Sequence, residues 1–231
     1  MKTIGVIILS RFNSTRLPGK ALMEIREKPI LKYILERISQ VVEKSNIIIA
    51  TSSEDTDDPI AKFASKEEIN CYRGSLDNVS CRFLKASQNS GWDYTIRING
   101  DNIFVDTDLL IEMINLAQTG IYDFISNIDK RTFPIGMSIE IVKSSFYLDQ
   151  YHKVLENKDY KEHVMQHLYL NETGNTKYIY NTRLPEAAGC HLALDDQRDL
   201  KQTKYIIDQF KAPHWEYNLT EIYTILKNYM K

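Results

Sequence analysis

A chain of 231 residues allows one large domain or two small ones, and it is long enough to bury a sizeable core. Hydrophobic residues make up 43% of it and charged residues 26%, which is ordinary for a soluble globular protein. The formal net charge of −2 gives no global basic field, so nucleic acid and anionic membranes are not expected partners.

Cysteine content and the amino terminus indicate the compartment. Cys71, Cys81 and Cys190 are odd in number and lack C-x-x-C spacing, which argues against a disulfide framework and a zinc site. The first apolar run is too short for a signal peptide, and no stretch approaches the roughly 20 apolar residues of a membrane span. We therefore expect a cytoplasmic protein that does not enter a membrane.

Strand and helix patterns alternate over the first two thirds of the chain. Strands are expected at 4–9, 46–51, 69–72 and 94–98, and helices at 29–43, from 58 onward, at 76–87 and at 106–117. This alternation predicts right-handed βαβ units and an α/β fold with a doubly wound, mostly parallel sheet.

The pattern loosens after residue 120. Strands are expected at 122–126, 137–142, 177–181 and 191–194, and the second of these alternates enough to be half exposed or at an interface. Helices are expected at 144–156, 160–170, 196–210 and 219–229. Internal repeats and Pro/Gly-rich linkers are missing from the sequence, so we expect a single domain over 1–231 with a small inserted lobe at about 120–185.

A basic loop follows the first predicted strand. Its sequence, SRFNSTRLPGK (residues 10–20), contains Arg11, Arg16 and Lys20. Open α/β sheets bind ligands at the carboxyl ends of their strands, and three cations suit a polyanion such as a triphosphate. The glycine spacing of a P-loop or of a dinucleotide-binding turn is missing. The alternative interpretation is an ordinary solvated basic loop.

Two carboxylates also follow predicted strands. Asp101 comes directly after Gly100, which lets the backbone approach a ligand closely. Asp195 follows the short apolar segment 191–194. Either one could simply cap the next helix. If they converge, they could hold one Mg²⁺, because a carboxylate with phosphate oxygens is the usual minimal environment for that ion.

His163 and His167 lie four residues apart on the predicted helix 160–170. A metal-binding pair is conceivable, but the H-E-x-x-H pattern is absent because Glu162 precedes His163. Glu162 and His163 are therefore better interpreted as substrate contacts.

Six motifs in order resemble the cytidylyltransferase-like family of spore-coat polysaccharide biosynthesis proteins, which is related to acylneuraminate and KDO cytidylyltransferases. The resemblance covers nearly the whole chain. The motifs are Ser10 to Lys20 (family A-R-M-G-S-T-R-L-P-G-K), Arg73-Gly74-Ser75 (R-G-S), Arg97 to Asp101 (R-I-T-G-D), Arg131 to Gly136 with Glu140 downstream (R-T-Y-P-D-G), Lys161 to Val164 (R-E-H-V) and Asp195 to Leu200 (V-D-x-P-E-D-L).

This resemblance implies a Rossmann-like nucleotidyltransferase fold and a role for each matched residue. Lys20, Arg16 and Asp101 would be catalytic, and Asp101 with Asp195 would bind Mg²⁺. The nucleotide would lie against Ser10, Arg11, Arg16, Lys20, Arg73, Ser75, Asp77, Arg97 and Gly100. The acceptor would lie against Arg131, Glu140, Glu162 and His163. The lobe at 120–185 would bind the acceptor, and a homodimer would form through the 133–143 region.

The chain departs from the family pattern at several positions. Asn13 replaces a loop glycine, Ile103 replaces a proline, and Cys81 stands where an acidic residue is common. Ile135 and Ser138 stand where the family usually has aspartates, which makes the acceptor pocket less acidic.

Together these features predict a Mg²⁺-dependent nucleotidyltransferase with CTP as its donor. An oxygen of a sugar, sugar acid or small phosphorylated or phosphonylated metabolite would attack the α-phosphorus and displace pyrophosphate. One alternative is a glycosyltransferase with a nucleotide-sugar donor, although Asp101-Asn102-Ile103 is not the D-x-D motif of those enzymes. The other is a catalytically silent nucleotide-binding protein.

Overall fold

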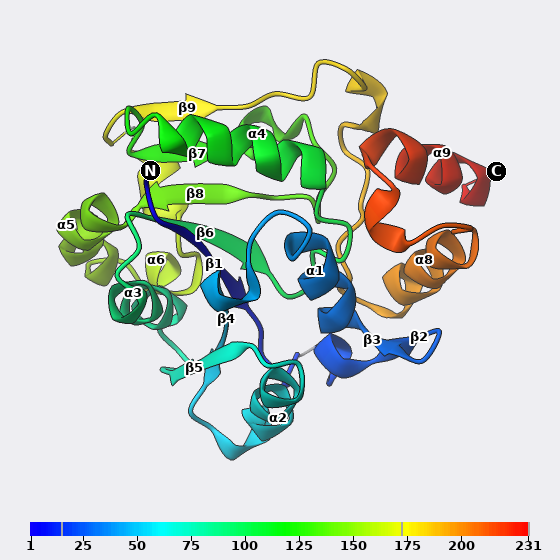
Figure 1. Cartoon of the computed structure of the whole chain (residues 1–231), viewed down its shortest axis with the longest axis horizontal. Coiled ribbons are helices and arrows are strands. Elements are labelled where there is room, and N and C mark those ends of the chain that lie inside the picture. The colour runs from blue at the N-terminus through cyan, green and yellow to red at the C-terminus, as the bar shows by residue number, and fades with distance from the viewer. Residues whose placement is uncertain (15, 172, 231) are drawn as a thin grey trace.

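The structure is a computed structural model that describes residues 1–14, 16–171 and 173–230 (Figure 1). Seven strands form one sheet in the order β5-β4-β1-β6-β8-β7-β9. Their bounds are β1 Ile4–Leu9, β4 Ile47–Ser52, β5 Asn70–Gly74, β6 Tyr94–Asn99, β7 Phe124–Ser126, β8 Glu140–Lys143 and β9 Thr176–Tyr178.

The predicted fold class is confirmed by the strand pairing. Strands β5, β4, β1 and β6 pair in parallel, and β9 pairs in parallel with β7. Only β8 runs antiparallel to its neighbours β6 and β7. The carboxyl ends of β1, β4 and β6 therefore meet at one edge, where doubly wound sheets bind ligands.

Helices cover both faces of the sheet (Figure 1). They are α1 Ile30–Ile38, α2 Asp58–Lys66, α3 Val79–Ser90, α4 Thr107–Gln118, α5 Ser144–Leu155, α6 Lys158–Glu162, α7 Gln166–Leu170, α8 Gln197–Asp208 and α9 Leu219–Tyr229. The apolar run of β1 is continuous because both faces of this strand are buried. Val6 and Ile8 pack into the core with α1, α4 and α9, whereas Ile7 and Leu9 pack into the core with α3 and α5.

Arg37 of α1 fastens the carboxyl-terminal part of the chain to this framework. Its side chain is fully buried and donates from Nη1 to the carbonyls of Val105 and Tyr217, at 3.1 and 3.0 Å, and from Nη2 to the carbonyl of His214. Three carbonyl partners satisfy a buried guanidinium largely through the backbone, so Arg37 has a structural role.

The segment predicted as an inserted lobe, 120–185, contributes β7, β8 and β9 to the main sheet. Its roles in acceptor binding and dimerisation stay predictions. The expectation that 137–142 is half exposed or at an interface is wrong for the part in β8, because Glu140, Ile141 and Val142 are buried between β6 and β7. A strand with neighbours on both sides has no free edge to offer a partner.

Several predicted boundaries are wrong for local reasons. The helix expected over 29–43 ends at Ile38 and continues only as turns. The helix expected over 160–170 is two short helices, because His163 between them has ψ 79°. Residues 191–194 form no strand, only an isolated bridge between His191 and Ile135. A small hairpin, β2 (Glu24–Ile25) with β3 (Lys28–Pro29), was not expected.

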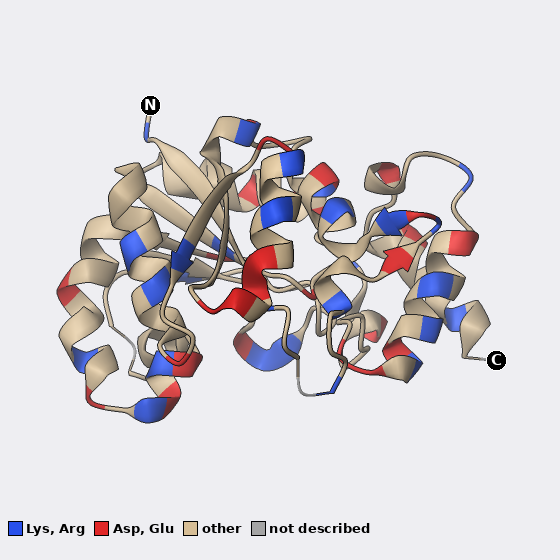
Figure 2. Cartoon of the chain, turned by 90° about the horizontal axis from the view of Figure 1, so that it is seen from below, with Lys and Arg blue, Asp and Glu red and all other residues tan. Residues whose placement is uncertain are grey.

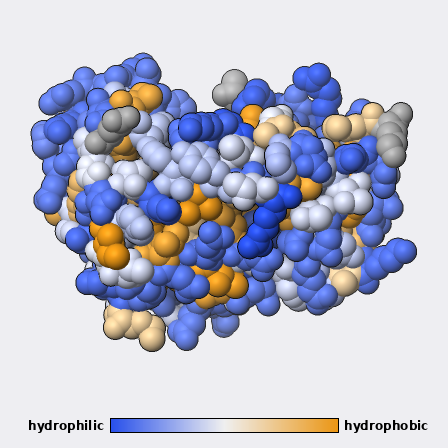
Figure 3. All heavy atoms as spheres, turned by 90° about the horizontal axis from the view of Figure 1, so that it is seen from above, coloured by the Kyte–Doolittle hydropathy of each residue, from blue (hydrophilic) through white to orange (hydrophobic). Residues whose placement is uncertain are grey.

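The surface is mixed in character. Basic and acidic residues are interspersed along the ribbon, as Figure 2 shows. Apolar side chains gather in the middle of the face seen from above, near α4 and β9 (Figure 3), and the exposed large hydrophobic residues include Ile111 and Ile121. None of the helices in the described part of the chain combines the length and apolar character that a membrane crossing needs.

Candidate active site

The basic loop leaves β1 at the ligand-binding edge of the sheet and is fixed there by Asp57. One oxygen of this buried carboxylate accepts from the backbone amide of Phe12 at 2.7 Å, and the other accepts from that of Ser52 at 2.8 Å. Burial alone would raise the pKa of Asp57, but hydrogen bonds from Ser52 and the Phe12 amide lower it overall. The ionised carboxylate thus joins the exits of β1 and β4.

Gly100 is required by the close approach of β6 and β1. Its backbone amide donates to the Leu9 carbonyl at 2.8 Å, and a Cβ at this position would lie 2.7 Å from Ser10 Oγ. Any larger residue would push the two strand ends apart. Gly100 therefore brings the following residue, Asp101, next to the basic loop.

Lys20 contacts both carboxylates that were predicted to bind Mg²⁺. Gly19 precedes it with φ 72°, a left-handed conformation that turns the chain into the short helix η1 (Lys20–Leu22). Lys20 Nζ lies 3.1 Å from Asp101 Oδ2 and 3.2 Å from Asp195 Oδ1, and it donates to the Leu194 carbonyl at 2.7 Å. The structure thus brings together residues from three distant parts of the chain.

The other two loop cations also have carboxylate partners. Arg16 Nη2 lies 2.9 Å from Asp195 Oδ1, and Arg11 Nη2 lies 2.9 Å from Glu162 Oε1. Each cation of the basic loop is therefore paired in the free protein.

A first cleft of about 390 Å³ opens over this loop. Residues from the exits of β1 and β6, from the start of α3 and from the end of α6 form its wall. They include Ser10, Arg11, Arg16, Lys20, Arg82, Arg97, Asn99, Gly100, Asp101, Glu162, His163 and Asp195. The lining is polar and has five Lys or Arg residues against three Asp or Glu residues, which suits a phosphorylated ligand.

A second cleft of about 290 Å³ adjoins the first. The two share six lining residues, namely Arg16, Arg97, Asn99, Asp101, His163 and Asp195. The second cleft adds Arg131, Gly136, Ser138, Glu140 and Tyr169. The predicted acceptor residues Arg131, Glu140 and His163 thus lie in one cleft, whereas Glu162 lines only the first.

The floor of the second cleft carries a buried ion pair. Arg97 Nη1 contacts Glu140 Oε2, and Arg97 Nη2 donates to Asn99 Oδ1 at 2.8 Å. Burial alone would lower the pKa of Arg97, but the charge and hydrogen bond of Glu140 raise it overall. The pair is fixed because the two residues face each other across β6 and β8.

Three predicted nucleotide residues line neither cleft. The guanidinium of Arg73 is occupied by the carbonyls of Ser52 and Glu54 and by Asp58, at 3.0, 2.7 and 2.6 Å. Ser75 accepts from the Asn78 amide at 3.0 Å, and Asp77 is exposed. These contacts shape the turn between β5 and α3.

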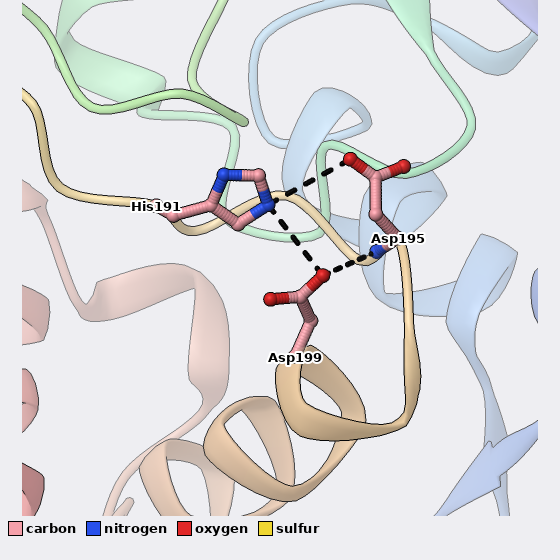
Figure 4. Close-up of side chains that lie close together, drawn as sticks. All are labelled: His191, Asp195 and Asp199. Carbon is pink, nitrogen blue, oxygen red and sulfur yellow. Dashed lines mark hydrogen bonds and ion pairs between the residues drawn. The ribbon is translucent and has the colours of Figure 1, made fainter. Parts of the chain in front are cut away.

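Asp101 and Asp195 fit the donor set of a hard divalent cation, because two carboxylates from distant parts of the chain converge on one cationic group, the Lys20 ammonium. Asp195 also belongs to a second group of possible ligands, with His191 and Asp199 (Figure 4). His191 Nε2 is 3.7 Å from Asp195 Oδ2 and 3.5 Å from Asp199 Oδ2. Asp199 Oδ2 already accepts from the amides of Asp195 and Asp196, which caps α8, so this group serves to orient Asp195.

Some lining residues were missed at the level of sequence. Arg82, Asn99 and Tyr169 line the clefts, and Asp57 anchors the loop. Asn99 stands inside the Arg97–Asp101 motif and could have been included. The other three carry no local signal, because Arg82 and Tyr169 lie on helices and Asp57 precedes one.

The chain is similar to known proteins over nearly its whole length. A family model described as cytidylyltransferase matches residues 5–227. The spore coat polysaccharide biosynthesis protein SpsF of Bacillus subtilis is 30% identical to this chain. The similar region spans 98% of this chain and 95% of SpsF. A 3-deoxy-manno-octulosonate cytidylyltransferase of Psychrobacter is 30% identical over 49% of this chain and 42% of its own. The solved structure of a cytidylyltransferase from Leptospira borgpetersenii superposes with a TM-score of 0.91 at 27% identity, covering 100% of this chain and 96% of that one.

Proposed function

The chain belongs to the cytidylyltransferase family, and from that membership we propose that it transfers a cytidylyl group from CTP to an oxygen of a small, anionic, sugar-related acceptor. Pyrophosphate is the second product, and Mg²⁺ is the required ion. As a member of this family the protein is an enzyme, a nucleotidyltransferase.

The convergence of Lys20, Arg16, Asp101 and Asp195 at the junction of two clefts carries this proposal. Arg16, Asp101 and Asp195 line both clefts, so a ligand in either one reaches the same charged group. An in-line transfer needs the attacking oxygen of the acceptor and the leaving pyrophosphate on opposite sides of the α-phosphorus. Two adjoining clefts with shared charged residues meet that requirement.

In the proposed complex, the triphosphate lies in the first cleft against the basic loop and the acceptor lies in the second. Lys20 and Arg16 bind phosphate oxygens and stabilise the charge that develops as the bond to pyrophosphate breaks. Asp101 and Asp195 would hold Mg²⁺, which when bound neutralises phosphate charge. Ser10 and Gly100 form the close wall that keeps the α-phosphate near the junction of the clefts.

Arg131 supports an acceptor with an anionic group. Its guanidinium lines the second cleft and makes no hydrogen bond or ion pair within the described residues, in contrast to the paired Arg97. The backbone at Lys130 and Arg131 is left-handed, with φ 54° and 47°, and such strain often accompanies a functional residue. The names of the relatives, a spore-coat polysaccharide protein and a 3-deoxy-manno-octulosonate cytidylyltransferase, point to a sugar or sugar acid.

The decisive test is pyrophosphate release with each of the four nucleoside triphosphates and a panel of sugar acids, sugar phosphates and phosphonates. We expect release with CTP that depends on both an acceptor and Mg²⁺, and that is lost in Asp101→Ala. Arg131→Ala should raise the KM of the acceptor and leave that of CTP unchanged. If no triphosphate and acceptor pair releases pyrophosphate, the proposed reaction is wrong. The homodimer and the cytoplasmic location stay predictions, and light scattering at micromolar concentration measures the first.

A further inference from the structure

Arg82 is a buried cation at the wall of the first cleft. It lies on α3, its residue surface is 1% exposed, and its side chain contributes to the cleft lining. Nη1 donates to the Ser75 carbonyl at 2.6 Å. Within residues 1–14, 16–171 and 173–230, neither Nε nor Nη2 has a hydrogen-bond partner, and no carboxylate forms an ion pair with the group.

Two other buried arginines, Arg37 and Arg97, have more hydrogen-bond partners than Arg82. Arg37 is equally buried, but three carbonyls accept from it and it lines neither cleft. Arg97 is partnered by Glu140 and Asn99. Nε is buried without a partner in all three arginines, but Arg82 differs in having one carbonyl as the sole partner of its Nη groups among the described residues while it faces the first cleft.

The charges near Arg82 compensate its burial only in part. Burial lowers the pKa of Arg82 to about 10, and the nearby positive charge of Arg11 adds to this effect, whereas the carboxylates of Asp57 and Glu162 oppose it from a distance. The guanidinium is still protonated at neutral pH. A buried charge with no carboxylate in direct contact is unfavourable, and an anionic ligand in the cleft would supply that contact.

We propose that Arg82 is a phosphate-binding residue, whose Nη2 group donates to the triphosphate of the nucleotide alongside Arg11. The inference rests on the proposed function, since it adds a residue to that nucleotide site. A planar guanidinium held at one corner by a carbonyl presents its remaining donors in a fixed direction, which matches phosphate oxygens. Glu162 would oppose phosphate binding, because its carboxylate pairs with Arg11 in the free protein and competes with the phosphates for that guanidinium.

Direct binding tests this proposal without knowledge of the acceptor. Isothermal titration with CTP, with inorganic tripolyphosphate and with cytidine would be carried out on the wild type, Arg82→Met, Arg82→Lys and Glu162→Gln, each with Mg²⁺ present. Arg37→Lys is the matched control for replacing a buried arginine. Thermal unfolding of every variant confirms that it is folded.

We expect Arg82→Met to weaken CTP and tripolyphosphate by about 10- to 100-fold, the effect of losing a hydrogen bond to a charged group. Cytidine binding should be unchanged, Arg82→Lys should be intermediate, and Glu162→Gln should bind tripolyphosphate more tightly. Arg37→Lys should lower the melting temperature without changing either dissociation constant.

Two results would overturn the proposal, and they differ from a failure of the proposed function. If Arg82→Met binds tripolyphosphate as the wild type does, or weakens cytidine as much as CTP, Arg82 does not bind phosphate. If the wild type itself binds neither CTP nor tripolyphosphate, the nucleotide site is wrong and the role of Arg82 is wrong with it.

Discussion

Replacing Asp57 by Asn tests whether one buried carboxylate holds the basic loop in place. The carboxylate accepts two backbone hydrogen bonds, from Phe12 at 2.7 Å and from Ser52 at 2.8 Å. The side-chain amide of asparagine keeps one acceptor oxygen, but it presents an NH₂ group, which cannot accept, to the second of the two backbone N–H groups. One charge-assisted bond is then lost and a buried N–H is left unpaired, which together cost about 2–4 kcal/mol.

The assay is thermal unfolding with CTP titration alongside it. For a chain of this size the melting temperature should fall by about 4–16 °C. CTP affinity should also fall, because the Phe12 amide belongs to the loop that carries Arg11 and Arg16. Asp55→Asn is the matched control, since Asp55 is an exposed carboxylate in the same turn.

The pH dependence adds an independent check. Because the folded pKa of Asp57 is lowered, its contribution to stability is present above its unfolded pKa of about 4 and is lost as the pH falls through the folded value. The gap in stability between wild type and Asp57→Asn should therefore narrow below pH 4. The role of Asp57 is refuted if the melting temperature of Asp57→Asn at pH 7 lies within 1 °C of that of the wild type. It is also refuted if Asp55→Asn lowers the melting temperature as much as Asp57→Asn does.

Three further predictions concern the charged side chains of Lys20 and Arg97 and the buried imidazole of His214. Lys20→Met should reduce the rate of pyrophosphate release by about 100- to 1000-fold, because it removes the donor at the position where charge develops; an unchanged rate in the assay would remove Lys20 from catalysis. Arg97→Met should cost about 3–5 kcal/mol in urea unfolding, because Glu140 is then buried without a partner, and adding Glu140→Leu should recover part of that loss. His214 is neutral at pH 7 because burial lowers its pKa to about 4 against the opposing hydrogen bond of Glu36. Its stabilising contribution is present above its unfolded pKa of about 6.5 and declines by about 1.4 kcal/mol per pH unit as the pH falls toward 4, so His214→Gln should flatten the acid limb of the stability curve.

Short-range patterns were enough to predict the core of the fold and the centre of the site. The apolar runs of β1 and β4 are buried on both faces, so their composition alone marks them as central strands. The basic loop and Asp101 could be grouped because parallel strands end at one edge. The position of Asp195 beside Lys20, 175 residues away, could not be predicted in this way, because the segment before Asp195 is not a strand.

Elements set by tertiary contacts could not be predicted in this way. The break at His163 is fixed by partners from elsewhere, since Tyr147 Oη donates to the Val164 carbonyl at 2.9 Å and Ser80 Oγ donates to the Tyr160 carbonyl at 2.5 Å. Arg82 has the sequence context of an ordinary helical surface residue, and only the packing of α3 against the sheet shows that it is buried. The turn with Arg26 and Glu27 at positive φ lacks the glycine or asparagine that usually announces such a hairpin.

The pairing of each loop cation with a carboxylate has a consequence for anions in the cell. A single phosphate or chloride ion can displace only one carboxylate, and it competes with a group tethered beside the cation. A triphosphate exchanges for several carboxylates in one event, so its later contacts form at the high effective concentration of a linked ligand. The free site therefore favours long polyanions over abundant small ones. In the proposed reaction, pyrophosphate has fewer anchoring groups than CTP, so the returning carboxylates would displace it and assist product release.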